Sequence, residues 1–149
     1  METKKDSINL VKELFSSQKL AVLSTQYGGQ PFSNLIAFAH ADDLRFLIFI
    51  TSRNTHKYRN ISAENKVSIL VDSRKHEISD FENAVAITAF GTAAEVTGKD
   101  RKSLASLYLK KYPHLEYFVN KPSNALIKID ITDLFIARFD SVHILHIDD

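Results

Sequence analysis

Apolar and polar residues alternate along much of the chain with the two-residue period of half-buried β-strands. Six or seven strands are expected, at 20–25, 31–40, 44–51, 66–72, 84–96, 123–139 (one long or broken strand) and 142–147. The run 44–51 is apolar on both faces, which predicts a central strand covered on both sides. Gly28 and Gly29, between the first two runs, predict a hairpin turn.

Three segments show the apolar spacing of helices instead, at 7–16, 55–64 and 100–112. Ser7 is the expected N-cap of the first helix, which leaves residues 4–6 in a frayed tail. The polar stretch 73–83 is expected to be a surface loop. Most connections between strands are too short for parallel crossovers, so the sheet should be antiparallel and close into a barrel. The expected fold is therefore mainly β with α insertions, in a single domain over residues 1–149.

The composition narrows the classes of function. The 149 residues include 19 basic and 18 acidic side chains, and a net charge of +1 argues against a general nucleic-acid binder. The absence of cysteine excludes disulfides and thiolate chemistry. There is no apolar signal segment, and no apolar run approaches the roughly 20 residues that cross a bilayer. A cytoplasmic protein that does not bind membranes is expected.

Positive charge concentrates just after the run 44–51, at the start of the second expected helix. Four basic side chains precede the first acidic one, Glu64: Arg53, His56, Lys57 and Arg59. A helix N-terminus already carries about half a positive charge, so cations in the first turn are unfavourable by roughly 0.3–1 kcal/mol each. A bound anion would remove this conflict, and phosphate is the obvious one.

The residues of this turn suit a phosphate. Ser52 and Thr55 offer hydroxyls, the first helical turn offers free backbone N–H groups, and Arg53 and Lys57 offer charge-assisted hydrogen bonds. His56 adds a donor when it is protonated. The alternative interpretation is a solvated helix start whose basic side chains only improve solubility.

Other motifs are uninformative. No Walker A, GxGxxG, GxSxG or HExxH pattern occurs. His143 and His146 are three apart in an expected strand, so they point to opposite faces and cannot chelate one ion together. No metal site is expected, and no catalytic residue can be assigned. Asn34 is unusual in a strand, and its amide could hydrogen-bond a flat heterocycle or a neighbouring turn.

The segments LAVLST, GGQPFSNLIAFA, LRFLIFITSRNTHKYRNISAENKVSILV and AITAFGTAAEV together resemble the pyridoxamine 5′-phosphate oxidase-like, FMN-binding split β-barrel superfamily. The resemblance covers residues 18–97 well and the C-terminal third more weakly. It implies a split barrel of six or seven strands with about three helices, and a homodimer with FMN in clefts between the subunits. It also implies nine cofactor-binding residues: Ser33, Asn34, Leu35, Thr51, Ser52, Arg53, Thr55, His56 and Lys57.

The chain departs from the vitamin B6 oxidases of that superfamily. These carry an arginine where Ser33 stands, a glutamine where Ala86 stands, and a tryptophan near the C-terminus, whereas this chain has no tryptophan. Pyridoxamine phosphate is therefore not the expected substrate. The resemblance implies an FMN-dependent oxidoreductase that takes electrons from a reduced nicotinamide or another donor. The alternatives are a non-catalytic flavin or haem carrier and a deazaflavin (F420) dependent reductase on the same barrel.

Overall fold

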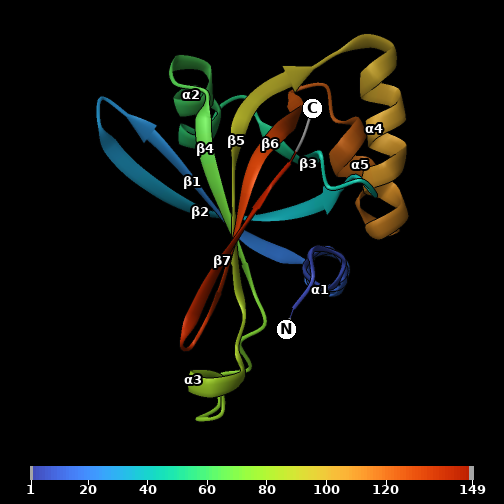
Figure 1. Ribbon diagram of the computed structural model, residues 1–149. Helices are drawn as coiled ribbons and strands as arrows, with labels where there is room; N and C mark the ends of the chain where they lie inside the picture. Colours follow the sequence, from blue (N-terminus) through green and yellow to red (C-terminus); the bar gives the residue numbers. More distant parts are fainter. Residues whose placement is uncertain (1, 148–149) are drawn as a thin grey trace.

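The computed structural model describes residues 2–147, whose strands form one antiparallel sheet (Figure 1). The strand order is β3-β2-β1-β4-β5-β6-β7, and β3 also pairs with β6, which closes the first six strands into a barrel. The strands are β1 (Leu20–Tyr27), β2 (Gln30–His40), β3 (Phe46–Ser52), β4 (Lys66–Asp72), β5 (Ala86–Val96), β6 (Asn124–Arg138) and β7 (Ser141–His146). The predicted mainly β, antiparallel barrel is confirmed.

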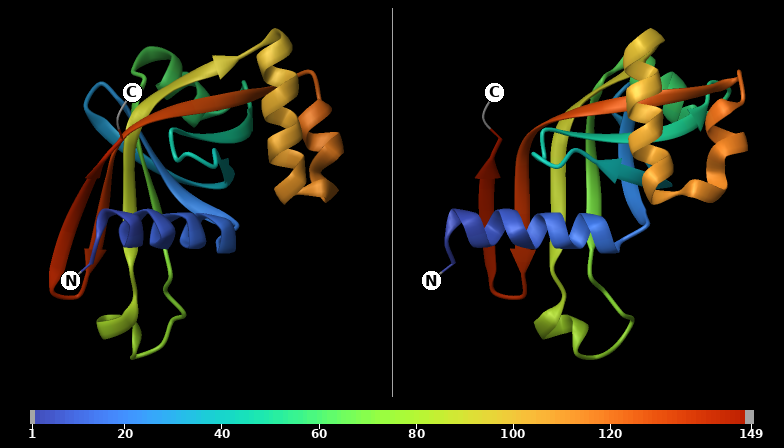
Figure 2. Two further views of the ribbon diagram at one scale, coloured as in Figure 1. Left: turned by 45° about the vertical axis from the view of Figure 1, so that its right-hand side comes forward. Right: turned by 90° about the vertical axis from the view of Figure 1, so that its right-hand side faces the viewer.

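Five α-helices and one 3₁₀ turn occur among the described residues. They are α1 (Lys4–Ser17), α2 (His56–Ala63), α3 (Asp80–Asn83), α4 (Gly98–Lys111), the 3₁₀ turn η1 (Pro113–Leu115) and α5 (Glu116–Asn120). Within residues 2–147, none of these helices has the length and apolarity to cross a bilayer. In Figure 2, α4 and α5 lie together beside the barrel, and α1 runs across the strands.

Strand β3 is buried on both faces, as the sequence predicts, because its side chains belong to two cores. Leu47 and Phe49 point into the barrel, where they join the inward side chains of the other strands. Ile48 and Ile50 point outward and pack against α4, in a second cluster that includes Tyr108. The strand is thereby held from both sides at the point where it ends in the basic turn.

The barrel is split between β2 and β3. These strands pair only from Phe38 opposite Phe49 to His40 opposite Leu47. The first half of β2 pairs with β1 alone, and the end of β3 pairs with β6 alone. The two strands diverge beyond Phe38, so their facing edges carry backbone groups without a ladder partner.

The first helix begins earlier than the sequence predicts. It begins at Lys4, because Thr3 and Asp6 form a reciprocal capping box. Ser7 is fully buried inside the helix, so the predicted cap at Ser7 and the frayed tail at 4–6 were wrong.

Gly91 sits at a register shift in β5, where an added Cβ would lie 2.2 Å from the carbonyl oxygen of Asp130. A glycine inside a strand often marks such a bulge and close backbone approach.

Candidate functional site

A cleft of about 450 Å³ opens where β2 and β3 diverge. The α4–η1–α5 segment forms its opposite wall. Eleven residues line it: Leu35, Ile36 and Ala37 of β2, Ile50, Thr51 and Ser52 of β3, Thr55 and Lys57 at the start of α2, and Tyr108, Leu115 and Phe118 of the opposite wall. The volume lies in the range of small-molecule sites, which are mostly apolar with a few directed polar groups.

One end of the cleft is the N-terminus of α2. Thr55 is the N-cap: its hydroxyl accepts a hydrogen bond from the Tyr58 N–H at 3.2 Å and donates to the carbonyl oxygen of Ser52 at 2.9 Å. The N–H groups of His56 and Lys57 have no hydrogen-bond acceptor in residues 2–147. Two free donors at the positive end of a helix favour an anion.

Lys57 adds a positive charge to these donors. Its side chain is half-buried in the cleft wall, and its ammonium makes no hydrogen bond or ion pair with any residue that the structure describes. Burial lowers the pKa of Lys57, because the charged form is taken partly out of water. An anion in the cleft would offset both the desolvation of Lys57 and its unfavourable position at a helix start.

Arg53 is placed differently. Its guanidinium forms a two-point ion pair with Glu95 of β5, with Nε–Oε1 at 3.2 Å and Nη2–Oε2 at 2.6 Å. The third donor, Nη1, bonds the carbonyl oxygen of Pro122 at 2.8 Å. The Tyr58 hydroxyl donates to the same carboxylate at 2.6 Å, and the hydrogen bonds from Arg53 and Tyr58 lower the pKa of Glu95. Arg53 therefore fixes the turn to β5 and to the start of β6.

The other end of the cleft is apolar. The unpaired edge of β2 runs along it, and one of its carbonyl oxygens, that of Ala37, accepts a hydrogen bond from the Tyr108 hydroxyl at 3.3 Å. Leu115 and Phe118 face this edge from η1 and α5. Apolar walls beside backbone donors and acceptors suit a planar heterocycle.

Comparisons with known proteins show the family and agree with the fold. Residues 9–136 match the family model described as pyridoxamine 5′-phosphate oxidase. The chain belongs to this family. No curated protein matches the sequence. The resemblance stated from the sequence segments is thereby confirmed.

Several proteins of known structure share the fold at low identity. The haem binding protein of Mycobacterium smegmatis has a TM-score of 0.83 and 12% identity, over 94% of this chain but only 57% of that protein. General Stress Protein 26 of Bacillus anthracis has a TM-score of 0.72 and 21% identity, over 94% of this chain and 98% of that one. A FAD-binding protein of Mesorhizobium loti has a TM-score of 0.68 and 16% identity, over 85% of this chain and 88% of that one. At these identities the likeness shows the fold alone.

Within this family fold, five of the nine residues expected at a cofactor site line the cleft: Leu35, Thr51, Ser52, Thr55 and Lys57. Besides Arg53, three others lie outside it. Ser33 is exposed on the outer face of the sheet, opposite Ser24. Asn34 is half-buried, and its Oδ1 is buried with no hydrogen-bond partner among the residues that the structure describes. His56 stacks on Phe32, with ring centroids 6.0 Å apart and an interplanar angle of 9°.

The sequence reasoning missed the opposite wall of the cleft. Ile36, Ala37 and Ile50 continue strands that it had already identified, so their place follows from the expected strand path. Nothing in the local pattern marks Leu115 or Phe118, because η1 and α5 are short and lie far along the chain from the basic turn.

Proposed function

We propose that the chain binds FMN in the cleft between β2 and β3 and acts as an oxidoreductase. One observation supports this most strongly. Lys57, whose ammonium has no partner among residues 2–147, stands beside two free N–H groups at one end of a cleft whose other end is apolar and has an unpaired strand edge. FMN has matching ends, a dianionic phosphate and a flat ring.

In this proposal the residues of the turn hold the phosphate. Lys57 supplies the charge, Thr55 and Ser52 the hydroxyls, and His56 its backbone N–H. The ring lies along β2 at Leu35, with Thr51 beside it. Bound FMN supplies the hydride or single-electron chemistry, so the protein is required only to bind it, orient it and exclude water. A reduced nicotinamide or another donor would provide the electrons, and the acceptor is an unidentified small molecule.

Pyridoxamine phosphate is not proposed as the substrate. Ser33 and Ala86 occupy the positions at which the vitamin B6 oxidases, by resemblance, carry an arginine and a glutamine. Ser33 has neither the charge nor the reach of that arginine. The proposal is therefore a different reductase or oxidase activity at the same flavin position.

A haem or flavin carrier is the second candidate function. It is favoured by the haem binding protein of Mycobacterium smegmatis, whose fold covers 94% of this chain. His143 and His146 are the histidines to test as haem ligands; the His146 ring contacts the carboxylate of Asp133. A deazaflavin would use the same cleft, because it also joins a flat ring to a phosphate.

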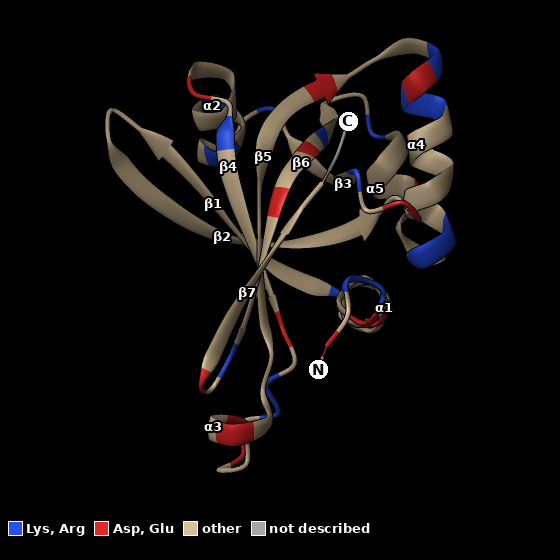
Figure 3. Cartoon of the chain, viewed as in Figure 1, with Lys and Arg blue, Asp and Glu red and all other residues tan. Residues whose placement is uncertain are grey.

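We also propose that the chain forms a homodimer through the outer face of its sheet. Strands β1 and β2 carry no charged residue (Figure 3). The strand registers align one outward row across six strands, all apolar except one threonine: Leu35, Val22, Leu70, Thr88, Phe135 and Ile144. A two-fold interface brings the same patch of both subunits together, and an uncharged patch does not repel itself.

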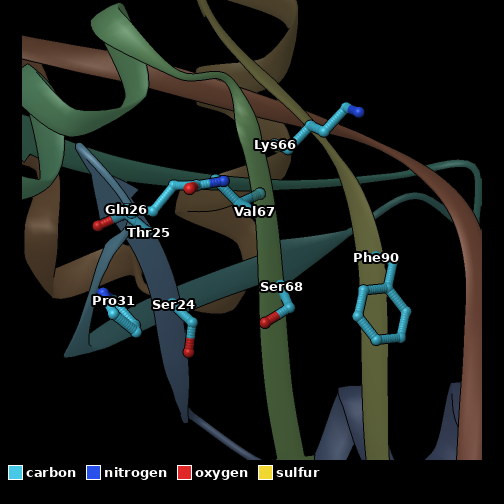
Figure 4. A pocket seen from close by; sticks show the side chains of 9 residues that line it. Ser24, Thr25, Gln26, Pro31, Lys66, Val67, Ser68 and Phe90 are labelled. Carbon is cyan, nitrogen blue, oxygen red and sulfur yellow. The ribbon is translucent and has the colours of Figure 1, made fainter.

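A more open hollow adjoins this row. Its volume is about 330 Å³, and Ser24, Ser68 and Phe90 lie side by side in it on β1, β4 and β5 (Figure 4). Leu35 belongs both to the apolar row and to the cleft between β2 and β3. A second subunit on the outer face would therefore also border the proposed flavin.

The absorption spectrum of the purified protein tests the proposed function. A yellow protein with flavin bands, bleached by NADH or NADPH and reoxidised by an acceptor with turnover, supports the oxidoreductase. Bound flavin without turnover favours the carrier. A Soret band that is lost on replacement of His143 or His146 favours haem. A colourless protein that takes up no added FMN would contradict the flavin proposal.

A further inference from the structure

The short helix α5 presents one aromatic side chain to the cleft. Phe118 lines the cleft, with 38% of its surface exposed. Its two neighbours point elsewhere, because Tyr117 is 84% exposed and lines no part of the cleft, whereas Val119 is fully buried in the cluster beneath α4. Phe118 is thus an aromatic ring left partly in water on the wall of a mostly apolar cleft.

The backbone around Phe118 is fixed by two polar side chains. Asn124, which is itself buried, donates its Nδ2 to the carbonyl oxygen of Phe118 at 2.8 Å. Arg101 of α4 donates through its Nη2 to the carbonyl oxygen of Val119 at 2.8 Å. The same nitrogen also donates to the carbonyl oxygen of Asn124 at 3.3 Å. A wall held from both sides loses little freedom when a ligand packs on it, and such preorganisation improves affinity.

This wall is also tied to the basic turn. Arg53 bonds the carbonyl oxygen of Pro122 through its side chain and that of Ser123 through its backbone N–H, at 2.8 and 3.1 Å. Residues 122 and 123 directly follow α5. The two ends of the cleft, one cationic and one aromatic, are therefore held at a fixed separation by the chain itself.

We infer that Phe118 is a specificity-determining residue, which packs against the flat ring of the ligand and selects fused heterocycles over small phosphate esters. This inference rests on the proposed flavin site. Aromatic packing is worth about tenfold in affinity, and it acts on the ring whether or not a phosphate is attached. Lys57, in contrast, acts only on the phosphate.

Equilibrium titrations with FMN and with riboflavin, which lacks the phosphate, test this inference. Phe118→Ala should weaken the binding of both ligands by the same factor, about tenfold. Tyr117→Ala, the neighbouring exposed aromatic, should leave both affinities unchanged. Phe118→Tyr keeps the aromatic face and should restore binding. If Phe118→Ala fails to fold, as judged by circular dichroism, Phe118→Leu preserves the apolar volume and should still bind both flavins more weakly.

The outcomes separate this inference from the proposed function. A wild-type protein that binds FMN, with Phe118→Ala or Phe118→Leu indistinguishable from Tyr117→Ala, overturns the role of Phe118 alone. A loss confined to FMN, with riboflavin unaffected, also overturns it, because the ring would not be the contact. A wild-type protein that binds neither flavin overturns the proposed function, and this inference with it.

Discussion

Arg53 and Lys57 lie four residues apart in the same basic turn, but their surroundings differ. Arg53 is paired with Glu95, and Lys57 has no partner among the described side chains. The sequence shows both as basic residues at a helix start and cannot distinguish them, because Glu95 lies 42 residues away along the chain. Tertiary contacts, and not the local sequence, decide which of the two cations is free to bind an anion.

Replacing Arg53 should therefore affect stability more than phosphate recognition. Arg53→Gln removes the two-point pair with Glu95 and should lower the free energy of unfolding by about 1 kcal/mol, since the pair is partly exposed. The ratio of FMN to riboflavin affinity should stay at its wild-type value. Urea denaturation and the two titrations measure these quantities. A selective loss of FMN affinity would show that Arg53 contacts the phosphate after all.

Gly91 should not tolerate a side chain. An added Cβ would lie 2.2 Å from the carbonyl oxygen of Asp130, which is backbone and cannot move aside without shifting β6. Gly91→Ala should therefore destabilise the fold by about 1–3 kcal/mol or more. Ala94→Ser, at an exposed position of the same strand, should change stability by no more than about 0.5 kcal/mol. Equal unfolding midpoints for the two variants would contradict the close approach.

At the scale of elements, the strands were predicted well because alternation is a local signal. Strand β4 was predicted with its observed bounds, Lys66–Asp72. The start of α1 was placed too late because Ser7 is a plausible cap in isolation, whereas Thr3 has a partner in Asp6. Helix α5 was missed because it has only five residues, too few for helical periodicity to show.

The contact between α4 and α1 should make stability depend on pH. The Lys111 ammonium donates to the carbonyl oxygens of Phe15 and Gln18, both at 2.8 Å, at the end of α1. Burial lowers the pKa of Lys111 from 10.5 to about 8. Between about pH 8 and pH 10.5, Lys111 is more fully protonated in the unfolded chain than in the folded one. The free energy of unfolding should therefore rise with pH over this range.

The prediction concerns the difference between the wild type and Lys111→Met. The free energy of unfolding of the wild type should increase relative to the variant from pH 8 to pH 10, measured by urea denaturation. Burial raises the pKa of Tyr108, and that of Tyr112 to about 12, which lowers the stability of both proteins above about pH 10 and cancels in this difference. A constant or falling difference between pH 8 and pH 10 would contradict the assignment.

The molecule as a whole has two exposed surfaces that suit binding. One is the cleft between β2 and β3, and the other is the outer row that ends in Leu35 and Ile144. Both terminal residues are substantially exposed, at 67% and 44%. Neither surface could be read from the sequence alone, because each depends on strand register across segments that are distant in the chain.

Charging the outer row should prevent dimer formation. Ile144→Lys places a cation in the outer row of each subunit, where it faces the same apolar patch of the other subunit. The variant should be a monomer in sedimentation velocity at a concentration where the wild type is dimeric. Ile78→Lys, at a highly exposed position of the arm that carries α3 (Figure 1), should leave the dimer intact. A monomeric wild type, or dissociation by both variants alike, would contradict this interface.

The affinities of the wild type and of Lys57→Ala for FMN and for riboflavin decide whether the start of α2 is a phosphate site. The wild type should bind FMN more tightly than riboflavin. Lys57→Ala should lose roughly 1.5–3 kcal/mol of FMN binding, the range for a hydrogen bond to a charged group, with riboflavin affinity unchanged. Arg59→Ala, an exposed cation of the same helix, should change neither. An FMN affinity that survives Lys57→Ala, or an equal loss for both ligands, would contradict a phosphate site at the start of α2.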